Sequence, residues 1–131
     1  PEIVALKKGE SFGHGPDGKT FRAVGHEWDV RPSRLRSMTA STPPGTSLPD
    51  EPPGMVTLAM GRKGSGGTLD YFTAPAKSID GVIAEMIYWE RPDGGRVFNA
   101  GAIGAGWAIS VDSKFQSLIR NVLHHFGVKP A

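Results

Sequence analysis

The clearest periodic pattern of apolar residues lies near the C-terminus, over residues 113–126. Six apolar side chains recur there at the three- and four-residue intervals that place them on one face of a helix: Phe115, Leu118, Ile119, Val122, Leu123 and Phe126. Ser113 and Gln116 have the spacing of a capping box, and Gly127 suits the left-handed residue that ends a helix. We therefore predict an amphipathic helix here, which must pack on a sheet or on a partner.

Two segments upstream have the composition of β-strands joined in a hairpin. Residues 82–89 and 96–100 are rich in β-branched and aromatic side chains, and residues 91–95 between them are turn formers. Both faces of residues 82–89 are apolar, which is typical of an inner strand that is covered on two sides. Glu85 is the exception, and a charge at such a position needs a partner.

Weaker patterns occupy the first half of the chain. Residues 55–60 are predicted to form a strand, with residues 68–73 as a candidate pairing partner, and residues 20–28 could form another. Six prolines within residues 31–54 predict a long loop without regular structure. One strong helix and four or five short strands are too few for a three-layer domain. The chain is therefore either a small α+β domain whose loops cover the second face of the sheet, or part of a larger unit.

Composition narrows the class of protein. A length of 131 residues suits one domain over 1–131, and the absence of cysteine excludes disulfides, thiolate nucleophiles and cysteine-ligated metals. No apolar run is long enough to cross a membrane and no signal-peptide pattern opens the chain, so we expect a cytoplasmic protein without a membrane partner. Fifteen Lys and Arg against thirteen Asp and Glu give a net charge of only +2, which argues against a nucleic-acid partner.

The densest cluster of functional side chains is the sequence Gly-His-Glu-Trp-Asp at residues 25–29. If this segment is extended, Glu27 and Asp29 lie on one face, and two carboxylates at this spacing could bind a cation or take part in acid–base chemistry. A strand end with solvated acids is the alternative explanation, and the spacing alone does not decide between the two.

Other candidate sites have simpler explanations. Residues 101–106 contain three glycines but match no phosphate-binding motif, so we favour tight packing over ligand binding there. His124 and His125 suit the C-terminal end of a helix, and neighbouring helical residues point too far apart to chelate a metal. Five basic residues could bind an anion if the fold gathered them, but solvated loops are the favoured interpretation: Arg31, Arg34, Arg36, Arg62 and Lys63.

The C-terminal half of the chain resembles a known family. Residues 84–90, 94–103 and 121–126 are similar to the C-terminal end of the large subunit of N,N-dimethylformamidase and its relatives, and residues 24–29 resemble the Gly-x-Glu-x-Asp segment of that family. The family's domain has a parallel sheet with helices on both faces. The resemblance therefore implies an α/β fold, flavodoxin-like (class I glutamine-amidotransferase-like), of which this chain is the closing portion, with few strands, one strong C-terminal helix and long loops rich in proline and glycine.

The resemblance also implies a chemistry, because the family hydrolyses small amides with a mononuclear iron held by two tyrosines and a glutamate. It implies that Glu27 is the metal ligand of this chain and that His26 is a catalytic group beside it, able to hydrogen-bond or to shuttle a proton. Tyr71 and Tyr88 do not stand in the matching segments. The tyrosine ligands would therefore come from a second polypeptide chain or a missing upstream segment.

Two functions of different kinds follow. The first is an iron-dependent amidohydrolase that cleaves the C–N bond of a small amide and is active only with additional polypeptide. The second is a non-catalytic small subunit or interaction module that docks through its apolar helix face. We rank the hydrolase first, the interaction module second and an anion or nucleic-acid binder last.

Overall fold

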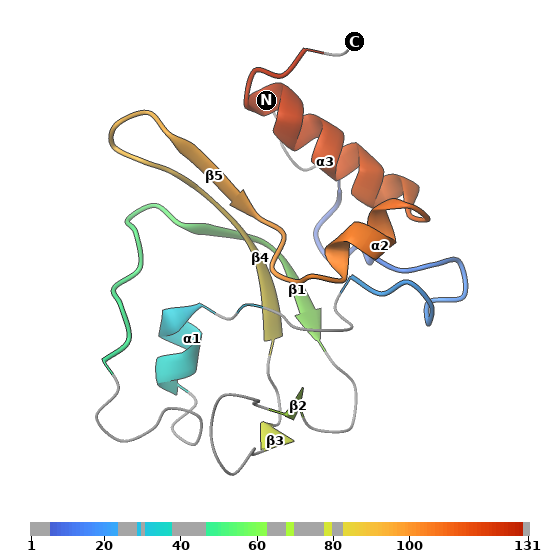
Figure 1. Ribbon diagram of the computed structural model, residues 1–131, viewed down its shortest axis with the longest axis horizontal. Coiled ribbons are helices and arrows are strands. Elements are labelled where there is room, and N and C mark those ends of the chain that lie inside the picture. Colours follow the sequence, from blue (N-terminus) through green and yellow to red (C-terminus); the bar gives the residue numbers. More distant parts are fainter. Residues whose placement is uncertain are drawn as a thin grey trace.

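The computed structural model describes residues 6–23, 29, 31–37, 47–62, 68–69, 78–79 and 83–129. These residues form a small mixed α/β domain with a three-strand antiparallel sheet and helices (Figure 1). Its elements follow in the order α1 (Pro32–Ser37), β1 (Val56–Arg62), β2 (Thr68–Leu69), β3 (Ser78–Ile79), β4 (Ile83–Glu90), β5 (Arg96–Asn99), α2 (Ala105–Ile109) and α3 (Ser113–His125).

The sheet has the order β1-β4-β5, so β4 is the inner strand. Its hairpin with β5 pairs Glu90 with Arg96, and Gly94 takes the positive φ of 85° that the turn between them requires. The hairpin and the inner position of β4 are thus confirmed. Both pairings of β4 are antiparallel, whereas the family that the sequence resembles has a parallel sheet.

The strand expected over residues 55–60 is confirmed as β1, but its expected partner is wrong. β1 pairs with β4, from Val56 opposite Tyr88 to Arg62 opposite Ile83. Residues 68–69 form β2 and pair instead with β3. An inner strand such as β4, apolar on both faces apart from Glu85 and the terminal Glu90, offers two edges. The hairpin occupies only one of them, so the second edge is available to β1.

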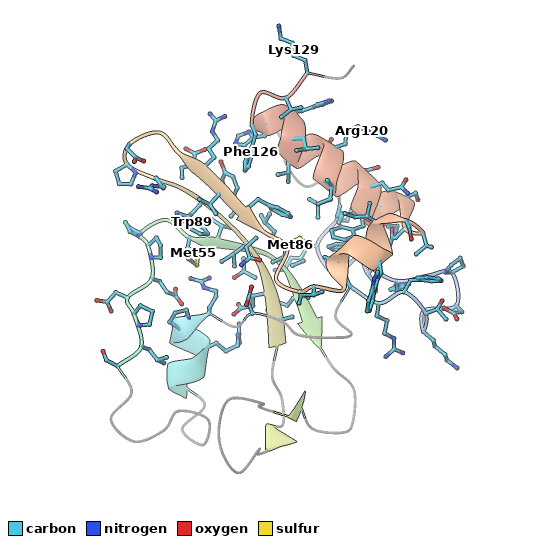
Figure 2. The ribbon with its side chains drawn as sticks, viewed as in Figure 1. Met55, Met86, Trp89, Arg120, Phe126 and Lys129 are labelled. Atoms are coloured by element: carbon cyan, nitrogen blue, oxygen red, sulfur yellow. The ribbon has the colours of Figure 1, made fainter. Side chains whose placement is uncertain are left out.

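α3 packs on one side of the sheet and forms the core with it. Its buried residues Phe115, Leu118 and Val122 meet Met86 of β4, together with Ala105 and Ala108 of α2. Figure 1 shows α2 and α3 on one side of the strands and α1 on the other, and in Figure 2 Met86 lies on the α3 side. The predicted helix over 113–126 is confirmed, and the part of its apolar face that Phe115, Leu118 and Val122 form is covered by the chain's own sheet.

The start of α3 differs from the predicted capping box. The N-cap is Asp112, whose carboxylate accepts hydrogen bonds from the backbone N–H groups of Lys114 and Phe115. Gln116 does not reach back to the helix start, because its side-chain amide donates to the carbonyl of Ile109 at 2.8 Å. An extended aspartate one residue earlier satisfies the same orphan N–H groups, and so replaces the serine. At the other end Gly127 has a φ of +87°, as predicted.

Two further expectations for the first half of the chain are wrong. The proline-rich segment is not entirely irregular, because Pro32 begins α1. Proline suits the first helical position, where its missing N–H has no partner to lose. Residues 20–23 form bends rather than a strand, and the rest of that expected strand lies outside the described residues. None of the helices in the described ranges is long and apolar enough to cross a membrane.

Candidate functional site

His26 and Glu27, the two site residues expected from the sequence, lie outside the described residues. The described residue that follows them on the same segment is Asp29. Its N–H donates to the carbonyl of Gly101 at 2.8 Å, and its carbonyl accepts from the N–H of Glu85 at 3.2 Å. Its carboxylate is exposed and accepts a hydrogen bond from the side-chain amide of Asn99 at 3.1 Å. Asp29 is therefore a solvent-accessible carboxylate anchored beside the inner strand, at the point where β5 has ended.

Two of the three glycines of residues 101–106, Gly101 and Gly104, serve close packing, which confirms the favoured interpretation at these two positions. Gly101 has a φ of +78°, and a Cβ atom there would lie 2.4 Å from the carbonyl oxygen of Glu85. A Cβ atom at Gly104 would lie 2.7 Å from the carbonyl oxygen of Arg22. Both glycines thus let two backbone segments approach more closely than any side chain would allow.

Glu85 is the most buried charged residue that the structure describes, with only 2 % of its surface exposed. Its carboxylate accepts hydrogen bonds from the guanidinium of Arg34 at 3.0 and 3.1 Å. It also accepts from the N–H of Arg31 at 3.3 Å and from the hydroxyl of Thr57 at 3.2 Å. The prediction that this charge needs a partner is confirmed, and the partners come from α1, from the residue before it and from β1.

The network continues through Arg31 to the surface. The Arg31 guanidinium donates to the Thr57 hydroxyl at 2.9 Å and forms a salt bridge with Glu51. Glu51 also accepts from the N–H of Ser33 at 2.8 Å, while the Arg31 Nε is buried without a hydrogen-bond partner among the described residues. The fold therefore gathers Arg31 and Arg34, as an anion site would require, but the anions that they bind are carboxylates of the chain itself.

Every charge in this network is held in its ionised form. Burial raises the pKa of Glu85, but the hydrogen bonds from Arg34 and Arg31 lower it by more, so the net shift is downward. The hydrogen bond from Arg31 lowers the pKa of Glu51 to about 2, and the pKa values of both arginines are raised. Four donors occupy the lone-pair positions of the Glu85 carboxylate, so it is not available as a base or as a metal ligand.

Tyr88, on the opposite face of β4, also has its hydroxyl group engaged in hydrogen bonds within the chain. Its hydroxyl donates to the Glu90 carboxylate at 2.7 Å, and Nε2 of His125 lies 2.7 Å from the Tyr88 hydroxyl oxygen. Burial, followed by the hydrogen bond to Glu90, raises the pKa of Tyr88 to about 12. A phenol ligates a metal as the phenolate, so a raised pKa makes Tyr88 a poor ligand. His125 lies in the last turn of its helix, as expected.

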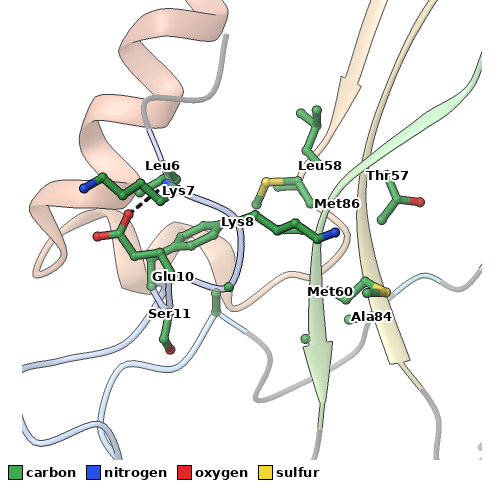
Figure 3. A pocket seen from close by; sticks show the side chains of 16 residues that line it. Leu6, Lys7, Lys8, Glu10, Ser11, Thr57, Leu58, Met60, Ala84 and Met86 are labelled. Carbon is green, nitrogen blue, oxygen red and sulfur yellow. Dashed lines mark hydrogen bonds between the residues drawn. The ribbon is translucent and has the colours of Figure 1, made fainter. Parts of the chain in front are cut away.

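A cleft of about 970 Å³ lies between the N-terminal residues 6–12 and the sheet (Figure 3). Its walls are mainly apolar, with Phe12, Leu58 and Met86 among the lining residues. Figure 3 shows the Lys8 side chain extended across it toward β1. Clefts of this size and polarity hold small molecules in many proteins.

The described part of the chain brings together no group of three or more His, Asp or Glu side chains that could hold a metal ion. That finding does not concern Glu27, which lies outside it. No protein-family model, curated protein or solved structure matches the chain.

Proposed function

We propose that the chain is the closing portion of an iron-dependent amidohydrolase, which cleaves the C–N bond of a small amide in the cytoplasm and is active only with additional polypeptide. The observation that supports this proposal is the placement of Asp29, an exposed carboxylate anchored to both Glu85 and Gly101 on the segment that carries His26 and Glu27. Glu27 would be the metal ligand, and His26 would hydrogen-bond beside it or move a proton. Iron, when bound, would act as a Lewis acid on the amide carbonyl.

Additional polypeptide is needed because Tyr88 and Glu85 are already hydrogen-bonded within the chain and could not act as metal ligands. Tyr88 is held protonated by burial and by Glu90, and Tyr71 does not stand in a segment that matches the family, so the phenolate ligands would have to come from elsewhere. Glu85 is saturated by its arginines and supplies no further carboxylate. In this proposal the flavodoxin-like, class I glutamine-amidotransferase-like sheet belongs to the complete domain, and the three antiparallel strands of this chain close one end of it.

The cleft beside β1 supports a small and mostly apolar substrate. Its walls are apolar, and Glu10 at its rim is held by the N–H of Lys7 at 3.0 Å and by the ammonium group of Lys114. An uncharged small amide carries one strong acceptor and one apolar body, which matches a lining of this kind. A cationic substrate would lose hydration in this cleft without gaining a free countercharge, because Glu10 is already held by Lys7 and Lys114.

The experiment is purification of the protein from its own source without chelator, followed by native mass spectrometry and metal analysis. We expect a complex larger than 13.9 kDa that carries iron and releases dimethylamine from N,N-dimethylformamide. Glu27→Gln should lower both the iron content and the activity, whereas Asp93→Asn, on an exposed turn, should change neither. A metal-free monomer would overturn the proposal, and so would an isolated chain that hydrolyses the amide by itself.

The alternative, an interaction module, has less support from the fold. Phe115 and Leu118 of the apolar helix face are 0 % and 1 % exposed, because that face packs on the chain's own sheet. Among the described apolar residues of α3 and the segment after it, those with a large exposed surface are Leu123, Phe126 and Val128, near the C-terminal end. Glu27→Ala separates the two functions, since it should weaken iron retention in a hydrolase and leave partner binding through α3 unchanged.

A further inference from the structure

A second hollow, of about 380 Å³, shares no lining residue with the cleft and is formed by two cationic and two aromatic side chains. Its lining residues are Lys19, Phe21, Arg22 and Trp107. Both aromatic residues expose 55 % of their surface, although Phe and Trp usually bury most of theirs. The residues come from the loop of residues 13–23 and from α2, which are far apart in the sequence.

The backbone at Phe21 is strained. Its φ of +48° is the only positive value among the non-glycine residues that the structure describes. A bulky residue is a true outlier in this region, because its Cβ atom crowds the neighbouring carbonyl. Strain of this kind persists where the surrounding structure imposes it, and it is concentrated at ligand-binding sites. Packing does not explain the strain, because the ring that it positions is largely exposed.

The loop that carries Phe21 is fixed by hydrogen bonds within itself and to the start of α3. The N–H of Gly15 donates to the carbonyl of Thr20 at 2.9 Å, and the N–H of Ala23 donates to the carbonyl of Gly13 at 2.7 Å. The Asp112 carboxylate ties the same loop to the start of α3 by accepting from the N–H of Gly13. The backbone that carries Lys19, Phe21 and Arg22 is therefore held in place before any ligand arrives, which lowers the entropy cost of binding.

The loop and α2 are also in direct contact. A Cβ atom at Gly104, the residue before α2, would lie within 2.8 Å of the carbonyl oxygens of both Arg22 and Ala23. This close approach sets the position of Trp107, one turn into the helix, relative to Arg22. The spacing across the hollow is therefore a property of the fold and not of side-chain motion alone.

Lys19 and Arg22 bring two positive charges to the hollow. Within the described part of the chain, neither Lys19 nor Arg22 has an ion-pair partner. Asp17 is the acid closest to them in the sequence, and one of its carboxylate oxygens is occupied by three donors: the N–H of Lys19, the N–H of Thr20 and the hydroxyl of Thr20. Two unpaired cations beside two exposed rings suit a ligand that is both planar and anionic.

We propose that this hollow binds a mononucleotide, whose base stacks on Phe21 and Trp107 and whose phosphate is held by Lys19 and Arg22. A simple anion would explain the cations but not the strained and exposed aromatic ring. A nucleic-acid strand would require an extended basic surface, which a net charge of +2 does not provide. The volume lies within the range of small-molecule sites. This site is independent of the proposed amide chemistry.

The test is isothermal titration of the full chain with adenosine monophosphate, adenosine and inorganic phosphate. We expect the monophosphate to bind at least tenfold more tightly than either of the other two, because only it engages both the rings and the cations. Equal affinity for the monophosphate and inorganic phosphate would overturn the proposal. Tighter binding of a single-stranded oligonucleotide than of the mononucleotide would overturn it in favour of a strand-binding surface.

Variants at the hollow separate binding from folding. Phe21→Gly removes the ring and also relieves the positive φ, so it should weaken binding at least about fivefold while raising the melting temperature. Lys19→Ala and Arg22→Ala should weaken binding, whereas Lys129→Ala, a surface cation outside the hollow near the C-terminus in Figure 2, should not. Unchanged affinity in Phe21→Gly, or equal losses in Lys19→Ala and Lys129→Ala, would overturn the proposal.

Discussion

Replacement of Asp112 by alanine would leave four backbone N–H groups without their acceptor. One carboxylate oxygen accepts from Lys114 at 2.8 Å and from Phe115 at 3.1 Å, which caps α3. The other accepts from Gly13 at 2.5 Å and from His14 at 3.3 Å, which fastens the loop of residues 13–23 to the same helix end. A single side chain thus joins two segments that are about a hundred residues apart in the sequence.

The loss in the free energy of unfolding follows from the two roles of the Asp112 carboxylate. Loss of an N-cap costs about 0.5–2 kcal/mol, and a buried donor left without a partner, here the N–H of Gly13, costs about 1–3 kcal/mol. We therefore expect Asp112→Ala to lower the free energy of unfolding by about 2–4 kcal/mol, a large part of the stability of an ordinary domain. Asp112→Asn retains one acceptor oxygen and should cost about half as much.

The pH dependence of this loss tests the reasoning further. Burial raises the pKa of Asp112, but the hydrogen bonds from Phe115 and Gly13 outweigh it and hold the pKa below 3.8. A lowered pKa in the folded state stabilises the protein above about pH 4, and this contribution disappears as the pH falls through the folded-state value. The deficit of Asp112→Asn should therefore be full at neutral pH and shrink in acid.

Urea unfolding of the wild type and both variants at neutral and acidic pH measures these differences. Asp93→Asn is the matched control, because that carboxylate is on an exposed turn and should cost less than about 0.5 kcal/mol. The reasoning is refuted if Asp112→Ala costs no more than the control. It is also refuted if the deficit of Asp112→Asn stays the same at both pH values.

Three other perturbations test the sheet and its buried charges. Glu85→Gln should lower the free energy of unfolding by about 2–4 kcal/mol in urea titrations, because the Arg34 guanidinium loses its countercharge but is partly exposed to water. Gly101→Ala should prevent stable folding by circular dichroism, since its Cβ would overlap a carbonyl oxygen, whereas Gly94→Ala, with open space around it, should cost only about 1–2 kcal/mol. In an absorbance titration Tyr88 should ionise near pH 12, well above an ordinary tyrosine, and ionisation of both tyrosines near pH 10 would contradict its burial and its bond to Glu90.

The elements that sequence patterns predicted are those whose own residues determine them. α3 has an apolar stripe with helical period, and β4 and β5 have strand composition around a turn that contains Gly94. α1 was not predicted, because six residues are too few for a periodic signal and the surrounding prolines indicated a loop. Its position is set instead by contacts far along the chain, above all the salt bridge from Arg34 to Glu85.

The difference between local patterns and distant contacts also explains how much of the sites could be predicted. The position of Glu85 on an apolar strand showed that the charge needed a partner, but Arg34 lies 51 residues earlier and no local pattern connects the two. Phe21 and Trp107 were missed because composition does not distinguish an exposed aromatic side chain from a buried one. Only the positive φ of Phe21 and the shared hollow set these two apart, and both require the fold.

The hydrogen bonds and ion pairs within the chain leave few of the described charged groups free to take part in chemistry. Glu85 and Asp112 are the two buried carboxylates among the described residues, and the oxygens of each accept hydrogen bonds from donors within the chain. Groups that are saturated in this way stabilise the fold and bind nothing else, because a ligand would have to displace charged or backbone donors. Asp29 is an exposed carboxylate with an anchored backbone, whereas Lys19 and Arg22 are cations without an ion-pair partner among the described residues, at a hollow that Asp29 does not line. A metal-dependent hydrolase and a nucleotide site would therefore use separate groups, so loss of one activity should leave the other intact.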